Sequence, residues 1–251
     1  MANRRAVAVI PSRYASTRFP GKPLALLDGR PMVAHVVDRA REAGCFAEVI
    51  VATDDERVAA AARVSGATAV MTGPSRTGTD RVAEVARGLA AEVIVNVQGD
   101  EPAVPPGSLR TLATFLLDNP AVPVATLALP AGEEDMRDPN VVKVVCADSG
   151  DALYFSRAPI PWPRNPESGA TRRHVGLYGF QREALLAFAA WPEAALERVE
   201  GLEQLRALAN GMAIRVLAAA GGSVAVDTPD DVPRAEAALR DLLKSRGEDR
   251  G

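Results

Sequence analysis

The chain has 251 residues, of which 47% are hydrophobic, and its formal net charge is only −3 at pH 7. This length and composition suit one large core, so we predict a single domain over residues 1–251. The charge excludes a strongly basic nucleic-acid-binding surface, and no apolar run approaches the roughly 20 residues that span a bilayer, so we expect neither nucleic acid nor membrane as a partner.

The first predicted element is a buried strand over Ala6–Ile10, a run of small and β-branched apolar residues. Pro11 ends it because proline cannot donate to a sheet ladder. The following loop concentrates cations and hydroxyls: Ser12, Arg13, Ser16, Thr17, Arg18 and Lys22. Ligands of open α/β sheets bind outside the carboxyl ends of strands, so these cations favour a polyanion such as a nucleoside triphosphate. The alternative is a solvated basic loop, which the stiffening by Pro20 and Pro23 makes less favourable.

Strand and helix patterns then alternate, which is typical of a largely parallel sheet with crossover helices. The further predicted strands are Glu48–Ala52, Ala67–Met71, Glu92–Val97, Val122–Ala128 and Ala213–Leu217. The predicted helices are Pro31–Ala43, Asp55–Ser65, Asp80–Ala90, Gly107–Leu117, Glu183–Ala190, Leu202–Asn210 and Pro229–Leu243. The pattern therefore predicts an α/β fold.

The alternation breaks between residues 130 and 180, where the sequence is irregular and rich in proline. Val141–Cys146 and Leu153–Phe155 predict antiparallel strands within this segment. We predict an inserted lobe that covers the ligand edge of the sheet, and its apolar strands suggest a dimer surface. The two cysteines, Cys45 and Cys146, are far apart and lack metal-ligand spacing, which favours reduced thiols in a cytoplasmic protein.

Two carboxylates follow predicted buried strands: Asp100 in QGDEP and Asp227 in SVAVDTPDD. With only two histidines in the chain, a metal must be held by oxygen, and Mg²⁺ takes one or two carboxylates plus phosphate oxygens and water. The alternatives are a turn aspartate at Asp100 and a helix N-cap at Asp227. Beside Arg13 and Lys22 the metal interpretation is favoured at Asp100, whereas both interpretations stay open at Asp227.

Other polar residues allow both a functional and a structural interpretation. The stretch Thr77–Thr79, with its central glycine, suits a base edge, ribose or phosphate, or is an ordinary helix start. Arg157 and His174 fall in the predicted lobe, where cations would suit a second anionic partner such as a sugar acid. The alternative for His174 is a partly buried strand histidine. For Glu203 and Gln204 it is a solvated helix face.

Taken together, these segments resemble one family, the 3-deoxy-D-manno-octulosonate (Kdo) cytidylyltransferases. The likeness runs in order through IPSRYASTRFPGKPL, TGTDRVAEV, VNVQGDEP, ALYFSRAPIPW, RHVGLYGF, LEQLR and VDTPDD, and covers nearly the whole chain. The stretch ALYFSRAPIPW separates this family from other nucleotidyltransferases. The resemblance implies a Rossmann-like, mostly parallel sheet with a small dimer-forming lobe, a homodimer, CTP and Kdo as substrates, Mg²⁺ as cofactor and a place in lipopolysaccharide biosynthesis.

The resemblance also implies a set of site residues. The CTP-binding residues would be Arg13, Ser16, Arg18, Lys22, Thr53, Asp54, Arg76, Gly78 and Thr79. Mg²⁺ would be held by Asp100 and Asp227, and these carboxylates would act in catalysis with Arg13 and Lys22. The sugar-binding residues would be Gln98, Arg157, His174, Tyr178, Glu203 and Gln204.

The expected reaction is a direct transfer without a covalent enzyme intermediate. The anomeric hydroxyl of Kdo would attack the α-phosphorus of CTP in line, giving CMP-Kdo and pyrophosphate. One alternative is a different sugar-acid acceptor, such as 8-amino-Kdo or a sialic acid, and another is a nucleotide-sensing module without turnover. An NAD-linked enzyme is disfavoured because no G-x-G-x-x-G follows the first strand.

Overall fold

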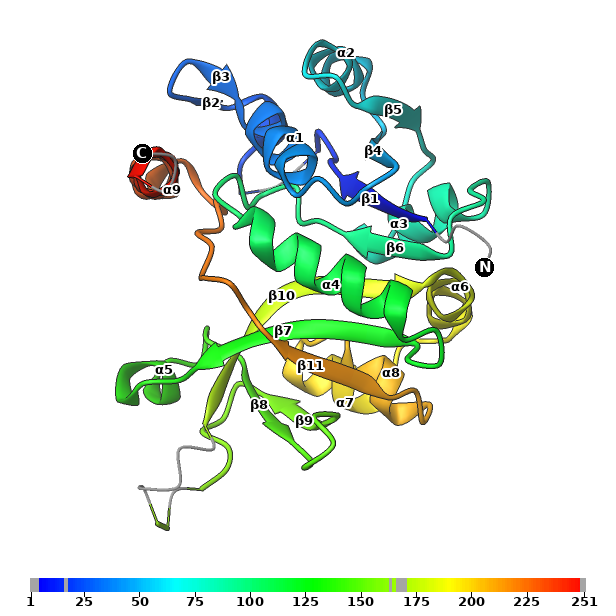
Figure 1. The fold of residues 1–251 in the computed structure, drawn as a ribbon, viewed down its shortest axis with the longest axis vertical. Coiled ribbons are helices and arrows are strands. Elements are labelled where there is room, and N and C mark those ends of the chain that lie inside the picture. The colour runs from blue at the N-terminus through cyan, green and yellow to red at the C-terminus, as the bar shows by residue number, and fades with distance from the viewer. Residues whose placement is uncertain (1–4, 16–17, 163, 166–170, 249–251) are drawn as a thin grey trace.

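The computed structural model describes residues 5–15, 18–162, 164–165 and 171–248. A twisted central sheet runs through the molecule with helices on both faces (Figure 1). Its strand order is β11-β7-β10-β6-β1-β4-β5. These strands are β1 (Ala6–Pro11), β4 (Glu48–Thr53), β5 (Thr68–Met71), β6 (Val93–Asn96), β7 (Val124–Pro130), β10 (Arg172–Gln181) and β11 (Ile214–Ala218).

The sheet is mostly parallel. β1 pairs in parallel with β4 and β6, β4 with β5, and β11 with β7, whereas β10 runs antiparallel to both β6 and β7. A separate small sheet is the hairpin of β2 (Leu26–Leu27) and β3 (Arg30–Pro31). The predicted fold class, a Rossmann-like and mostly parallel α/β sheet with a small antiparallel part, is confirmed.

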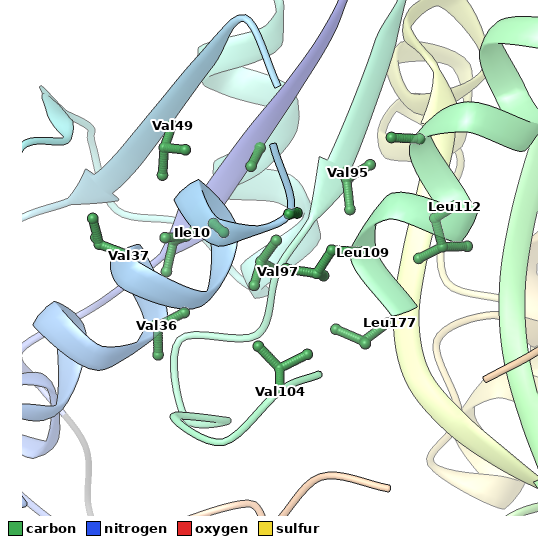
Figure 2. Packing of buried hydrophobic residues seen from close by; sticks show 14 of the residues in the cluster. Ile10, Val36, Val37, Val49, Val95, Val97, Val104, Leu109, Leu112 and Leu177 are labelled. Carbon is green, nitrogen blue, oxygen red and sulfur yellow. The ribbon is translucent and has the colours of Figure 1, made fainter. Parts of the chain in front are cut away.

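Helices cover the sheet in two layers (Figure 1). One face packs against α1 (Met32–Glu42), α2 (Glu56–Val64) and α4 (Pro106–Asp118), and the other against α3 (Gly78–Ala86), α6 (Arg182–Ala190) and α8 (Leu205–Ala209). β1 is buried on both sides because its alternate residues enter different clusters, with Ile10 in the first and Val9 in the second. Figure 2 shows Ile10 with Val36 and Leu112 in the first cluster.

Further helical elements complete the described ranges. They are α5 (Glu133–Arg137), α7 (Ala195–Glu200), α9 (Val232–Glu248) and two short 3-10 turns, η1 (Lys22–Leu24) and η3 (Pro229–Asp231). α9 packs on the β2–β3 hairpin, where Leu239 joins Leu27 and Val226 in a third apolar cluster. Within the described ranges, none of the helices combines the length and apolar character that crossing a bilayer requires.

The predicted strands and helices are all present in the structure with shifted ends, but the predicted lobe of residues 130–180 needs a correction at its end. β8 (Lys143–Cys146) and β9 (Ala152–Ser156) form the expected antiparallel pair. Arg172–Gln181 instead form β10, which lies inside the central sheet between β6 and β7. The charged start of this strand and its glycines Gly176 and Gly179 obscure its apolar pattern. That the lobe covers the site and dimerises stays a prediction.

Candidate functional site

A polar cavity of about 300 Å³ opens at the carboxyl ends of β1 and β6. Its lining includes five cations, Arg13, Arg18, Lys22, Arg76 and Arg81, and two carboxylates, Asp100 and Asp227. We call it the cation-lined cavity. The neighbouring strands β1 and β6 are parallel, so the described parts of the loops that leave them, residues 12–15 with 18–23 and residues 97–101, emerge at the same edge. A cavity with this excess of cations suits a polyanion.

Lys22 joins the two carboxylates of the cation-lined cavity. Its Nζ lies 2.8 Å from Oδ2 of Asp100 and 3.7 Å from Oδ1 of Asp227, and its side chain is only 17% exposed. Arg18 reaches Asp227 from the more exposed side, with 3.1 Å between Nη2 and Oδ1. Both carboxylates therefore face one cation position.

A backbone hydrogen bond brings the two distant carboxylates together. The Val226 amide donates to the Asp100 carbonyl at 2.9 Å, and Val226 itself is fully buried. Oδ2 of Asp231 accepts hydrogen bonds from the Asp227 and Thr228 amides at 3.0 and 2.9 Å, so Asp231 caps this turn. The Asp227 carboxylate faces Arg18 and Lys22, which decides against the N-cap interpretation. The Asp100 carboxylate likewise reaches Lys22 across the cavity.

Gly99 allows the exits of β1 and β6 to approach closely. A Cβ at this position would lie 2.5 Å from the Pro11 carbonyl oxygen and 2.9 Å from Oγ of Ser12. We expect Gly99→Ala to lower the free energy of unfolding by about 1–3 kcal/mol because it forces the two exits apart. Gly176→Ala, where a Cβ would meet nothing within 4 Å, is the matched control for urea denaturation. Equal stability of the two variants would contradict this packing.

A second, smaller cavity of about 20 Å³ lies between β10 and α8. Its polar lining is Thr79, Tyr178, Glu203 and Gln204, and its apolar lining includes Phe180 and Phe188. We call it the Glu203 cavity. Burial and the nearby Glu203 carboxylate raise the pKa of Tyr178, so its hydroxyl is protonated and can donate a hydrogen bond. The solvated-face interpretation is wrong for Gln204, which is 8% exposed.

The residues predicted to bind CTP do not all lie in one cavity. Arg76 and Gly78 line the cation-lined cavity with Arg13, Arg18 and Lys22. Asp54 lies behind it, bound to Arg81, and Thr53 is fully buried at the end of β4. Thr79 faces the Glu203 cavity instead, and Ser16 lies outside the described residues.

The remaining residues predicted to bind the sugar also lie in different parts of the structure. Gln98 lines the cation-lined cavity, and its Nε2 donates to the Gly176 carbonyl at 3.2 Å. His174 adjoins the Glu203 cavity through Tyr178, with 5.4 Å between ring centroids. Arg157 is not brought to either cavity, because its guanidinium donates to the backbone carbonyls of Glu200 and Pro139.

Comparison with known proteins identifies the family. Residues 7–214 match a family model described as cytidylyltransferase. The 3-deoxy-manno-octulosonate cytidylyltransferase of Anaeromyxobacter sp. strain Fw109-5 is 52% identical over 239 residues, covering 94% of this chain and 97% of that protein. The Myxococcus xanthus protein of the same name is 51% identical over 250 residues, covering 98% of this chain and 100% of the relative. This chain belongs to the 3-deoxy-manno-octulosonate cytidylyltransferase family.

A solved structure agrees with this family assignment. A CMP:2-keto-3-deoxy-manno-octonic acid synthetase complexed with CTP superposes with a TM-score of 0.90 at 43% identity, covering 94% of this chain and 99% of that one. The 4-diphosphocytidyl-2C-methyl-D-erythritol synthase of Anaerococcus prevotii, at 13% identity and a TM-score of 0.64, shares the fold alone.

Asp100 and Asp227 suit the Mg²⁺ that the family resemblance implies. Asp100 and Asp227 both lie within ion-pair distance of the Lys22 ammonium, so their oxygens can share one cation. No group of three or more His, Cys, Asp or Glu side chains suited to a metal occurs among the described residues. The pair would therefore need phosphate oxygens and water to complete a Mg²⁺ shell, which is the ligand set that Mg²⁺ prefers.

Sequence reasoning missed two residues, one that lines the cation-lined cavity and one that lies next to a lining residue in the chain. Arg81 is a lining cation with a side chain only 4% exposed, held by Asp54 at 2.8 Å and by Thr72. The sequence feature that could have indicated Arg81 is the stretch TGTDR, which places an arginine one turn into a helix that starts at the site. Glu101 is a buried carboxyl beside Asp100, and burial together with the Asp100 charge raises its pKa to about 7.

His174 makes stability depend on pH. Burial lowers its pKa from 6.5 to about 3, so the unfolded chain binds the proton more readily than the folded one. The contribution of His174 to the free energy of unfolding is therefore fully present above pH 6.5 and is lost as the pH falls toward 3. Between pH 7.5 and 5 we expect this group to remove about 2 kcal/mol of unfolding free energy. Urea denaturation should show a smaller loss in His174→Gln, and equal losses would contradict the buried neutral ring.

Proposed function

We propose that this chain transfers the CMP group of CTP to Kdo and releases pyrophosphate. The observation that carries the proposal is that Lys22, Asp100 and Asp227 meet at one point of a cation-lined cavity. The relatives are named for this activity, and the similar solved structure was determined with CTP.

The cations of the cavity would neutralise the triphosphate. Arg13, Arg18 and Lys22 come from the loop after β1, and Arg13 makes no ion pair with any side chain in the described part of the chain. The anomeric hydroxyl of Kdo attacks the α-phosphorus in line, and the bond to the β-phosphate oxygen breaks. Lys22 and Arg13 stabilise the negative charge that develops on pyrophosphate.

Asp100 and Asp227 are the proposed ligands of Mg²⁺. When bound, the ion would supply positive charge to the phosphate oxygens and help to hold the triphosphate in line. Lys22 lies between the same carboxylates, so it can reach phosphates of a nucleotide bound there.

The residues of the Glu203 cavity are the proposed contacts of the sugar acid, and the cavity, which at about 20 Å³ has room for one water molecule, has to widen to admit a sugar. Tyr178, Glu203 and Gln204 offer a donor, an acceptor and an amide to sugar hydroxyls. Gln98 stands in the cation-lined cavity, where it can contact either substrate. His174 and Arg157 stay predicted sugar contacts, and Arg157 would have to leave its carbonyl partners to reach the sugar carboxylate.

One assay matrix tests the function. CTP, UTP and ATP are each combined with Kdo, 8-amino-Kdo and a sialic acid, with and without Mg²⁺, and pyrophosphate is measured. We expect the highest kcat/KM for CTP with Kdo, one pyrophosphate per CMP-Kdo, and dependence on Mg²⁺. A preference for another acceptor would replace Kdo in the proposal. Binding of CTP without pyrophosphate release would favour the nucleotide-sensing alternative.

The homodimer is also proposed, on the basis of exposed apolar side chains near the β8–β9 pair. Leu153 in β9 is 63% exposed, Trp162 beyond it 81%, and Val199 in α7 83%. α7 and β9 are neighbours, because the Ser156 hydroxyl donates to Glu200 at 2.6 Å. Such exposed apolar groups mark interaction surfaces.

Sedimentation tests this surface. We expect twice the chain mass for the unsubstituted protein and a shift toward the monomer in Leu153→Asp and Val199→Asp, because a buried unpaired charge is costly. Val64→Asp is the matched control, since Val64 in α2 is 90% exposed away from this surface. Unchanged sedimentation of both test variants would contradict the surface.

We place the protein in the cytoplasm because Cys45 and Cys146 are both free thiols, and cell fractionation checks this.

A further inference from the structure

Glu203 connects the two cavities through hydrogen bonds. Its Oε1 accepts from the Thr77 hydroxyl at 2.8 Å, and its Oε2 accepts from the Thr79 hydroxyl at 2.6 Å. Thr77 lines the cation-lined cavity, whereas Thr79 and Glu203 line the other one. One carboxylate at the start of α8 thus fixes two side chains at the start of α3, although more than 120 residues separate them.

Thr77 and Thr79 are themselves fixed by further hydrogen bonds on the side of the cation-lined cavity. Thr77 is the N-cap of α3, and its Oγ1 also accepts from the Asp80 amide at 3.1 Å. Oγ1 of the buried Thr79 accepts from Nδ2 of Asn96, at the end of β6, at 3.3 Å. The adjacent residues Ser75 and Arg76 belong to the cation-lined cavity. A displacement of Glu203 would therefore move the loop of residues 75–79 and the wall of that cavity.

Buried groups restrict Glu203 from the other side. Arg206, 2% exposed, lies 3.7 Å from Oε1 of Glu203 and forms a two-point ion pair with Glu197 at 2.9 and 2.5 Å. Its guanidinium also lies over the ring of Phe188, 4.7 Å from the centroid, and Phe188 lines the Glu203 cavity. A ligand that contacts Glu203 therefore acts on a carboxylate that is held from both sides. Any shift of this carboxylate moves the loop of residues 75–79.

We propose that Glu203 couples the two cavities, so that a sugar acid that hydrogen-bonds to Glu203 tightens the binding of CTP in the cation-lined cavity. This inference rests on the proposed function. The first ligand restricts the remaining motion of the Glu203–Thr77–Thr79 contact, so the second ligand meets a wall that needs less further ordering. Linkage requires the effect to be reciprocal, so CTP tightens sugar-acid binding by the same factor.

Isothermal titration measures the coupling. CTP with a methylene bridge between its α- and β-phosphorus atoms binds without turnover, and its Kd is determined with and without saturating Kdo. We expect Kdo to lower this Kd at least about 5-fold, within the usual range of allosteric coupling. In Glu203→Gln and Thr79→Val the factor should fall toward one.

Two control variants separate coupling from general damage. Thr79→Ser keeps the hydroxyl and should keep the coupling factor. Thr111→Val removes a hydroxyl that donates to the Gly107 carbonyl within α4, and should also keep it. Thermal unfolding of each variant checks that the protein is folded. An unchanged factor in folded Thr79→Val and Glu203→Gln, or a factor that falls equally in Thr79→Ser, would overturn the coupling.

The proposed function and the coupling can fail separately. If the unsubstituted protein releases pyrophosphate from CTP and Kdo but binds the CTP analogue equally well with and without Kdo, the coupling alone is wrong. If it binds neither ligand, the proposed function is wrong and the coupling falls with it.

Discussion

Asp100→Asn is expected to lower the rate of CMP-Kdo formation by roughly 1,000-fold, within the range found when a group that stabilises transition-state charge is removed. The amide keeps the shape of the side chain and an oxygen that can accept from Lys22, which lies 2.8 Å from the carboxylate in the native protein. It removes the negative charge that a divalent cation requires. The loss should therefore appear in kcat rather than in folding.

The stability of the Asp100→Asn variant distinguishes a catalytic from a structural role. The Asp100 side chain is 31% exposed, and ion pairs this open to solvent contribute at most about 1 kcal/mol. Pyrophosphate release at saturating substrates and thermal unfolding are measured on the same preparation. Asp230→Asn is the matched control, because Asp230 is an exposed aspartate three residues after Asp227. A near-normal rate in Asp100→Asn would rule out Asp100 as a metal ligand.

Lys22→Met is expected to reduce kcat about 100- to 1,000-fold and to raise the KM for CTP. Methionine retains most of the apolar stem of Lys22 but not its charge. The variant leaves Asp100 and Asp227 facing each other without the ammonium that lies 2.8 and 3.7 Å from them. Charge on the leaving pyrophosphate would lose a stabilising partner, and the carboxylates would repel the triphosphate.

Steady-state kinetics with varied CTP and Mg²⁺ measure the effect of Lys22→Met. Lys244→Met is the control, since Lys244 is an exposed lysine on α9 whose side chain is 76% accessible. Lys22→Arg keeps the charge and should recover part of the rate. If Lys22→Met and Lys244→Met have the same kcat, Lys22 does not act on the phosphates.

The sequence predicts the edge of the sheet where the site lies, for physical reasons that are local. Ala6–Ile10 can only be a strand buried on both faces, and Pro11 must end it, so the cations of the next loop have to emerge at the carboxyl end. Asp100 follows from the same rule applied to β6, the parallel neighbour of β1. These assignments need no knowledge of distant contacts.

Other parts of the site depend on long-range contacts that no local pattern contains. Asp227 reaches Lys22 because the Val226 amide binds the Asp100 carbonyl, a contact between segments far apart in the chain. Thr79 faces Glu203 rather than the triphosphate side for a similar reason. In the sequence, Arg81 looks like an ordinary cation on a helix. Only the structure shows that its side chain is buried and bound to Asp54 and Thr72.

A crystal structure with CTP and Mn²⁺ in place of Mg²⁺ would test most directly whether the two carboxylates and the loop cations converge on one metal–triphosphate. We predict a single anomalous peak at ~2.1 Å from oxygens of both Asp100 and Asp227 and of the triphosphate, with Arg13 and Lys22 against the phosphates. A metal held elsewhere, with Asp227 still paired only with Arg18 and Lys22, would contradict the account.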